Sequence, residues 1–174
     1  MTMSTSRRYA LYAGVAAAAG LMGAGVAWQR HRVAEMPSSA LARLWDSEFD
    51  TPSGGLLKLS AFQGGGLVVN FWATWCPPCV EEMPLLDRFY RENSSKGWQV
   101  VGLAIDQPSQ VRRFLGQFPV SYSIGLAGFG GTELGQILGN SEGGLPFTVV
   151  LSSQGALKQR KVGKLSEDDL KSWV

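Results

Sequence analysis

An almost uninterrupted apolar run at residues 67–72, LVVNFW, constrains the fold of this chain more than any other feature. Such a run is typical of a strand buried on both faces, as in a parallel sheet. A helical pattern follows from Pro78 to about Asn93, and a second apolar run, WQVVGLAI, covers 98–105. Strand, helix and strand in this order predict a parallel pair joined by a right-handed crossover.

The rest of the chain predicts further short elements of both kinds. They are strand-like pieces within 43–62, a helix from Pro108 to about Phe118 capped by Asp106, a strand at 121–126, a helix at 131–138, an apolar strand at 147–151, a charged edge strand at 156–162 and a helix at 167–174 capped by Ser166. Together these elements predict an α/β sandwich with a mixed sheet.

The first 32 residues differ in character from the rest. Residues 9–28 carry no charged side chain, and twenty helical residues span about 30 Å, the thickness of a bilayer's hydrocarbon core. Either this run is an uncleaved transmembrane anchor, or it is a signal peptide cleaved near the small residues 25–27. Its length and the basic residues after it favour the anchor. We expect a signal or anchor segment at 1–32, a linker at 33–44 and a domain at 45–174.

The net charge and the few metal-ligating residues exclude several kinds of partner. The whole chain carries +2, but from Val33 onward 14 acidic residues outweigh 12 basic ones. A nucleic-acid-binding protein usually has a strongly basic surface, so no nucleic-acid partner is expected. Two cysteines and one histidine are too few for a disulfide-stapled scaffold or a four-ligand zinc site within one chain. A zinc site completed by carboxylates, or one shared between two chains, stays open as an alternative. Otherwise no zinc and no other cofactor is expected.

The two cysteines, Cys76 and Cys79, follow the first apolar strand and open the predicted helix. The N–H groups and the dipole of a helix N-terminus stabilise an anion, which lowers the pKa of a thiol placed there. Pro77 and Pro78 are tolerated in a first turn and stiffen the ring that a disulfide would close. The expected chemistry is thiol–disulfide exchange, in which Cys76 attacks and Cys79 resolves the mixed disulfide. Haem attachment would need histidine directly after Cys79, where Val80 stands.

Glu82 is the third candidate for chemistry at this site. It shares an otherwise apolar helical stripe with Cys79 and Met83. Burial there would raise the pKa of Glu82 and suit it to exchange a proton with the Cys79 thiol. Acidic residues are also common in a first helical turn without any catalytic role, because the helix dipole stabilises them. The pattern alone does not decide between the two interpretations.

Aromatic residues and a distant proline complete the candidate site. We expect Trp72 in the core and Trp75 partly exposed, as an apolar platform beside the cysteines. Pro146 follows Leu145 and two glycines directly before an apolar strand, which predicts a constrained turn. Cis prolyl bonds are uncommon, and nothing in the composition indicates one here.

Two segments resemble the thioredoxin superfamily: VVNFWATWCPPCVEEMP at 69–84 and GGLPFTVVLSSQGAL at 143–157. Within it the chain is similar, from about residue 45 to 174, to membrane-anchored TlpA/ResA-like thiol–disulfide oxidoreductases. The resemblance implies a thioredoxin fold with a family insertion between Asp106 and Leu145. It also implies an enzyme that reduces protein disulfides and needs no cofactor beyond its redox-active cysteine pair.

The resemblance also implies roles for individual residues. It implies that the bond before Pro146 is cis and lies against the disulfide, where substrate backbone docks. It implies that Glu82, the acid of the family's E-x-P motif, is functional, because Asn70 stands where thioredoxin proper has a buried aspartate. The predicted substrate-binding residues are Trp75, Pro77, Pro78, Leu145 and Pro146.

The implied location is the periplasmic side of the bacterial inner membrane, anchored by the N-terminal segment, or the periplasm itself after signal cleavage. The implied partners are protein disulfides and a membrane thiol-electron donor, since an exported reductant works in an oxidising compartment. Two alternatives stay open: a copper-handling thiol protein for cytochrome oxidase assembly, and a cytochrome c maturation thioredoxin. The latter branch usually has an acid directly after the proline, where this chain has Phe147.

Overall fold

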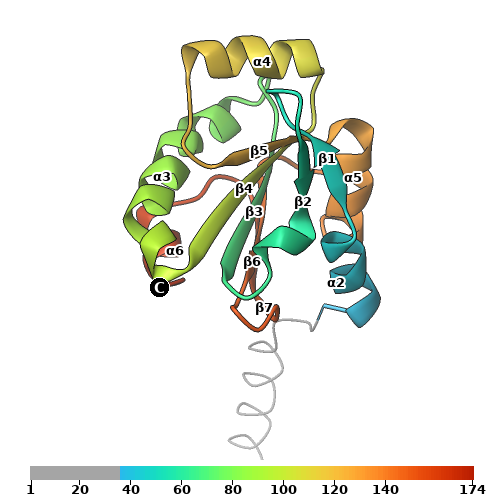
Figure 1. The fold of residues 1–174 in the computed structure, drawn as a ribbon, viewed down its shortest axis with the longest axis vertical. Coiled ribbons are helices and arrows are strands. Elements are labelled where there is room, and N and C mark those ends of the chain that lie inside the picture. The colour runs from blue at the N-terminus through green and yellow to red at the C-terminus, as the bar shows by residue number, and fades with distance from the viewer. Residues whose placement is uncertain (1–35) are drawn as a thin grey trace, which may run out of the picture. The chain divides into compact units, whose positions relative to one another are not determined.

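Seven strands form one sheet that organises residues 36–174, the part of the chain that the computed structural model describes (Figure 1). The strands are β1 (Glu48–Asp50), β2 (Leu56–Lys58), β3 (Gly66–Trp72), β4 (Trp98–Ala104), β5 (Ser123–Leu126), β6 (Phe147–Leu151) and β7 (Leu157–Val162). Their order across the sheet is β2-β1-β5-β4-β3-β6-β7.

The centre of the sheet has the parallel arrangement that the sequence predicts. β3 pairs in parallel with β4, and β4 pairs in parallel with β5. β6 lies antiparallel to β3 on the other side, and β7 lies antiparallel to β6 at the edge. Every residue of β3 is buried, as its apolar sequence predicts, whereas the charged strand β7 at the sheet edge is partly accessible along its whole length. The predicted mixed sheet is therefore confirmed.

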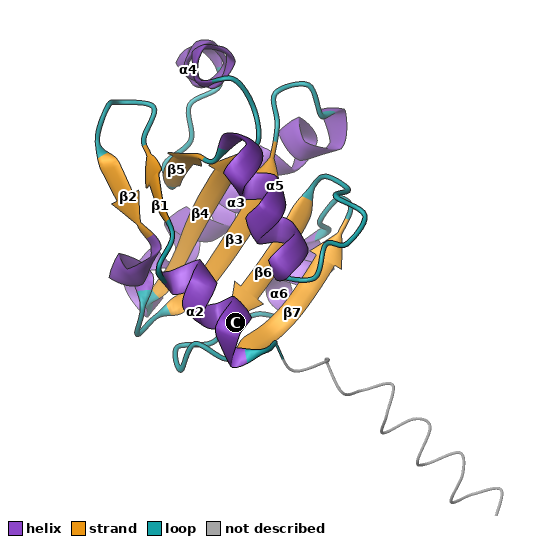
Figure 2. Ribbon diagram, turned by 90° about the vertical axis from the view of Figure 1, so that its right-hand side faces the viewer, coloured by secondary structure: helices purple, strands orange, loops and turns teal. Residues whose placement is uncertain are grey.

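Helices cover both faces of this sheet (Figure 2). They are α2 (Ser38–Trp45), α3 (Pro77–Asn93), α4 (Pro108–Gln117), α5 (Gly128–Ile137) and α6 (Glu167–Lys171), with short 3-10 turns at Leu59–Phe62 and Ser94–Lys96. The stretch between Asp106 and Leu145 thus holds α4, β5 and α5. The terminal helix is shorter than the predicted 167–174, and Ser166 caps it in a capping box with Asp169, as predicted for Ser166.

The side chains of β3 alternate between two hydrophobic clusters. Val68 and Trp72 belong to the cluster that contains the buried faces of α3 and α6. Leu67, Val69 and Phe71 belong to the other cluster, which α2 and α5 cover. Because successive residues of a strand point to opposite faces, Asn70 shares the α3 side with Val68 and Trp72. A single polar side chain of β3 therefore lies beneath the helix that carries the cysteines.

The structure differs from the sequence prediction at the start of the domain. Where a linker was expected at 33–44, α2 begins at Ser38 and buries Ala40 and Leu44. This short helix is stabilised by packing on the sheet, which its local sequence does not reveal. The predicted segment at 1–32 lies outside the described residues. Within 36–174, no helix has the length and apolar character needed to cross a membrane.

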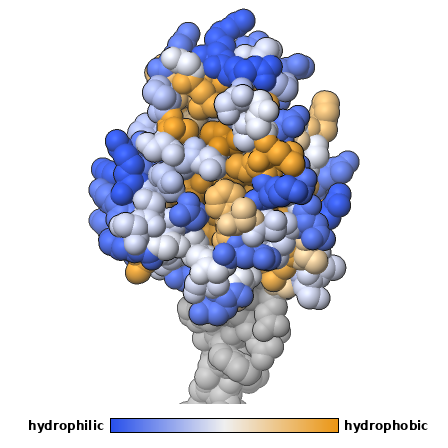
Figure 3. All heavy atoms as spheres, viewed as in Figure 1, coloured by the Kyte–Doolittle hydropathy of each residue, from blue (hydrophilic) through white to orange (hydrophobic). Residues whose placement is uncertain are grey.

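The described surface is mixed in character. Figure 3 shows hydrophobic side chains in the middle of one face, with hydrophilic ones around them. Seven large apolar residues are exposed: Leu56, Trp75, Phe118, Phe129, Ile137, Val162 and Val174. The most exposed of them is Phe129, on the first turn of α5, at 93%.

Candidate active site

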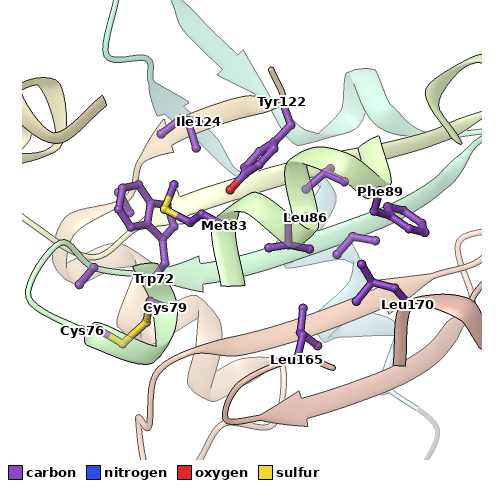
Figure 4. Close-up of a cluster of buried hydrophobic side chains, with 14 of the residues drawn as sticks. Trp72, Cys76, Cys79, Met83, Leu86, Phe89, Tyr122, Ile124, Leu165 and Leu170 are labelled. Atoms are coloured by element: carbon purple, nitrogen blue, oxygen red, sulfur yellow. A yellow bond between two sulfur atoms is a disulfide. The ribbon is translucent and has the colours of Figure 1, made fainter. Parts of the chain in front are cut away.

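The two cysteines lie where β3 gives way to α3, at the carboxyl end of the parallel strands. Cys76 is the N-cap residue of α3 and forms a disulfide with Cys79, with their Cα atoms 5.3 Å apart (Figure 4). The Cys79 side chain is completely buried, whereas Cys76 keeps 5% of its surface exposed. Cys76 is therefore the cysteine that an incoming partner reaches first.

The loop before Cys76 is fastened to the end of β4. The backbone N–H and the hydroxyl of Thr74 donate hydrogen bonds of 2.9 and 2.5 Å to one oxygen of Asp106. The other oxygen of Asp106 accepts a hydrogen bond of 2.6 Å from the backbone N–H of Gln107. The predicted capping role of Asp106 is wrong, because Gln107 is the N-cap residue of α4 and no side chain caps it. The Asp106 carboxylate instead holds the loop that leads into the cysteines.

Glu82 is completely buried on the face of α3 that contacts the sheet, as predicted. Its Oε1 accepts a hydrogen bond of 2.7 Å from the amide of Asn70, and its Oε2 accepts one of 2.7 Å from the backbone N–H of Leu165. Burial raises the pKa of Glu82, as predicted; the two hydrogen bonds and the charges of Lys161 and Lys164 limit this rise. The site thus holds an acid that takes up a proton more readily than a solvent-exposed glutamate.

Asn70 connects Glu82 to a third element. Its Nδ2 also donates a hydrogen bond of 3.0 Å to the hydroxyl of Thr148 on β6, its partner in the strand register. Thr148 and the N–H of Leu165 belong to the site without having been predicted from the sequence. The available signal was a polar residue in each of two apolar strands, because buried polar side chains need hydrogen-bond partners.

The predicted substrate-binding residues differ in their accessibility. Trp75 is 66% exposed and Pro77 is exposed, Pro78 and Leu145 are half-buried, and Pro146 is buried. The bond between Leu145 and Pro146 is cis, as the resemblance implied. The Leu145 side chain packs against the cluster that contains both cysteines, so this turn and the disulfide share one hydrophobic environment. Trp72 is fully buried, which confirms its predicted place in the core.

The sequence matches one known protein family along almost the whole of the described domain. Residues 35–173 match the Redoxin family. The chain is 28% identical over 123 residues to the thiol-disulfide oxidoreductase ResA of a Bacillus cereus strain, covering 70% of this chain and 68% of the relative. The expected similarity to ResA-like proteins is therefore confirmed.

Solved structures give the same result for the fold. The crystal structure of a putative thiol:disulfide interchange protein DsbE from Chlorobium tepidum superposes with a TM-score of 0.65 at 25% identity, covering 73% of this chain and 86% of that one. StoA from Bacillus subtilis gives a TM-score of 0.59 at 25% identity, covering 73% and 94%. The described domain has a thioredoxin-like fold.

Proposed function

Because the chain belongs to the Redoxin family and is a ResA-like thiol–disulfide oxidoreductase, we propose that it reduces disulfide bonds in exported proteins through Cys76 and Cys79. The observation that carries this proposal is the disulfide at the N-terminus of α3, in which a small part of Cys76 is accessible and Cys79 is completely buried. A helix N-terminus stabilises the thiolate that Cys76 needs as a nucleophile.

In the reduced protein, the Cys76 thiolate attacks one sulfur of a substrate disulfide. A bond forms between Cys76 and that sulfur, the substrate S–S bond breaks, and the released substrate thiolate takes up a proton. Cys79 then gives its thiol proton to the Glu82 carboxylate and attacks the Cys76 sulfur. The second substrate sulfur leaves as a thiolate and is protonated. Two electrons have passed to the substrate, and the protein is left with the Cys76–Cys79 disulfide.

A protein left in this oxidised state must be reduced again before the next cycle. In an oxidising compartment outside the cytoplasm, that reduction requires a dedicated thiol donor, which we propose to be a membrane protein. The charge-free run at 9–28 supports a position beside such a donor, as an anchor with the catalytic domain on the periplasmic side. Retention of the full chain in membranes after carbonate washing would support the anchor, and its release would favour cleavage of a signal peptide.

Substitution of each cysteine in turn tests the assigned roles. In the full chain, Cys79→Ser should accumulate mixed disulfides between Cys76 and substrate proteins, which dithiothreitol releases. Cys76→Ser should accumulate none and should not reduce a peptide disulfide. Turnover that survives in Cys76→Ser would refute the mechanism. Identification of the trapped proteins by mass spectrometry would name the substrates and the donor separately.

A further inference from the structure

A cleft of about 410 Å³ opens at Trp75, the residue before Cys76, between the β4–α4 connection and the start of α5. Its walls include Trp75, Ile105, Pro108, Phe129 and Thr132. Trp75 is 66% exposed and Phe129 is 93% exposed. Trp75 is also one of the predicted substrate-binding residues, but neither Leu145 nor Pro146 lines this cleft. The cleft therefore extends the predicted substrate surface on the side away from the cis peptide bond.

The chemistry of the cleft favours an apolar occupant. Asp106 is the one charged residue that lines it within the described chain. Both carboxylate oxygens of Asp106 are already engaged, one by two donors of Thr74 and the other by the N–H of Gln107. A cationic ligand would have to compete with these bonds. An apolar side chain, in contrast, would cover Trp75 and Phe129 without displacing any of them.

The position of the cleft identifies where such a side chain comes from. Trp75 forms one wall and directly precedes Cys76 in the chain, so a polypeptide whose disulfide is attacked by Cys76 passes next to the cleft. An extended polypeptide advances about 3.3 Å per residue, so a side chain near the attacked cysteine reaches an adjoining hollow. A volume of about 410 Å³ is within the usual range of ligand pockets.

We propose that this cleft is a specificity subsite that receives a large apolar side chain of the substrate polypeptide, close in sequence to the cysteine that Cys76 attacks. The inference rests on the proposed function. Phe129 is then a specificity-determining residue for which the disulfide motif gives no indication. Its contribution comes from covering its exposed ring, and burial of one such side chain is worth roughly a tenfold or larger change in affinity.

Two cystine peptides test the proposal with the full chain in detergent. They are identical except for phenylalanine or serine near the disulfide-bonded cysteine, in a series that varies the number of intervening residues. The wild-type protein should reduce the best phenylalanine peptide with a kcat/KM about tenfold above that of its serine counterpart. Phe129→Ala should remove most of this preference, by lowering the kcat/KM of the phenylalanine peptide more than that of the serine peptide.

Ile137→Ala is the matched control, because Ile137 is a 46% exposed apolar residue at the other end of α5. It should keep the wild-type preference. The subsite proposal fails if the wild-type protein reduces both peptides equally at every spacing, or if Phe129→Ala slows both to the same extent. A folded, prereduced wild-type protein that reduces neither peptide would instead overturn the proposed reductase function, and the subsite with it.

Discussion

The side-chain amide of Asn70 donates a hydrogen bond of 2.7 Å to Glu82, and both residues are completely buried. This bond joins β3, which leads into the catalytic loop, to α3, which carries the cysteines. It stabilises the ionised form of Glu82, whereas burial stabilises the protonated form. The balance between these two effects sets the pH at which Glu82 is ready to accept a proton.

We first predict that Glu82→Gln slows the reduction of peptide disulfides by about a hundredfold, a typical contribution of a positioned proton acceptor. The amide keeps the size of the side chain but cannot accept the Cys79 proton. Single-turnover kinetics should show that the mixed disulfide with Cys76 still forms and then decays slowly. A variant that releases both substrate thiols at the wild-type rate would exclude Glu82 from the reaction.

The second prediction concerns the pH dependence of that step. Asn70→Ala removes a hydrogen bond to the Glu82 carboxylate, so the pKa of Glu82 should rise further and the pH–rate profile should move to higher pH. Thr148→Val is the control, because it removes a different hydrogen bond of Asn70 and leaves both donors to Glu82 in place. Equal profiles for Asn70→Ala and Thr148→Val would mean that Asn70 is only structural.

Glu82 should also make the folding stability depend on pH. Its pKa in the folded protein is raised above the ordinary value of 4.5, so the folded state holds a proton that the unfolded state has released. This contribution is complete below about pH 4.5 and is lost as the pH rises through the folded-state pKa. Urea unfolding from about pH 4 to 8 should show Glu82→Gln gaining stability relative to the wild type as the pH increases. A constant difference would contradict the raised pKa.

A fourth prediction concerns the packing beneath Trp72. A Cβ atom at Gly102 on β4 would lie 2.7 Å from Ile124 Cδ1 and 3.1 Å from Trp72 Nε1. Gly102→Ala should therefore lower the free energy of unfolding by about 1–3 kcal/mol, as overpacking of a core does. Gly116→Ala is the control, since Gly116 lies in α4 and its added Cβ would meet no atom within 4 Å apart from its chain neighbours and the backbone of its own helix. This variant should be neutral or stabilising by up to about 1 kcal/mol. Chemical denaturation measures both.

The central elements of the fold follow from the sequence because the local pattern and the tertiary environment agree there. The run LVVNFW predicts a strand buried on both faces, and β3 is such a strand. The first turn of α5 shows the opposite case. The helix was predicted from residue 131, but it starts at Gly128, in a glycine-rich segment with poor intrinsic helix propensity. Phe129 therefore lies outside the predicted helix, and its position in the cleft wall could be found only from the structure.

In the candidate site, too, some residues could be predicted from the sequence and others could not. The spacing of Cys76, Cys79 and Glu82 on one helix is a local property, and the sequence was sufficient to place all three together. The partners of Glu82 come from β3 and from the loop after β7, at separations of 12 and 83 residues. Such pairings depend on strand order and register, which a single sequence constrains only weakly.

The bonds of Asp106 give the cleft and the nucleophile a fixed separation. Asp106 lines the cleft, and its carboxylate also accepts two hydrogen bonds from Thr74, in the loop that continues through Trp75 to Cys76. A side chain seated in the cleft is therefore held at a set distance from the attacking sulfur. Two substrates with the same residues in a different order would not be equivalent. The number of residues between the apolar side chain in the cleft and the attacked cysteine would then decide which disulfides the enzyme reduces.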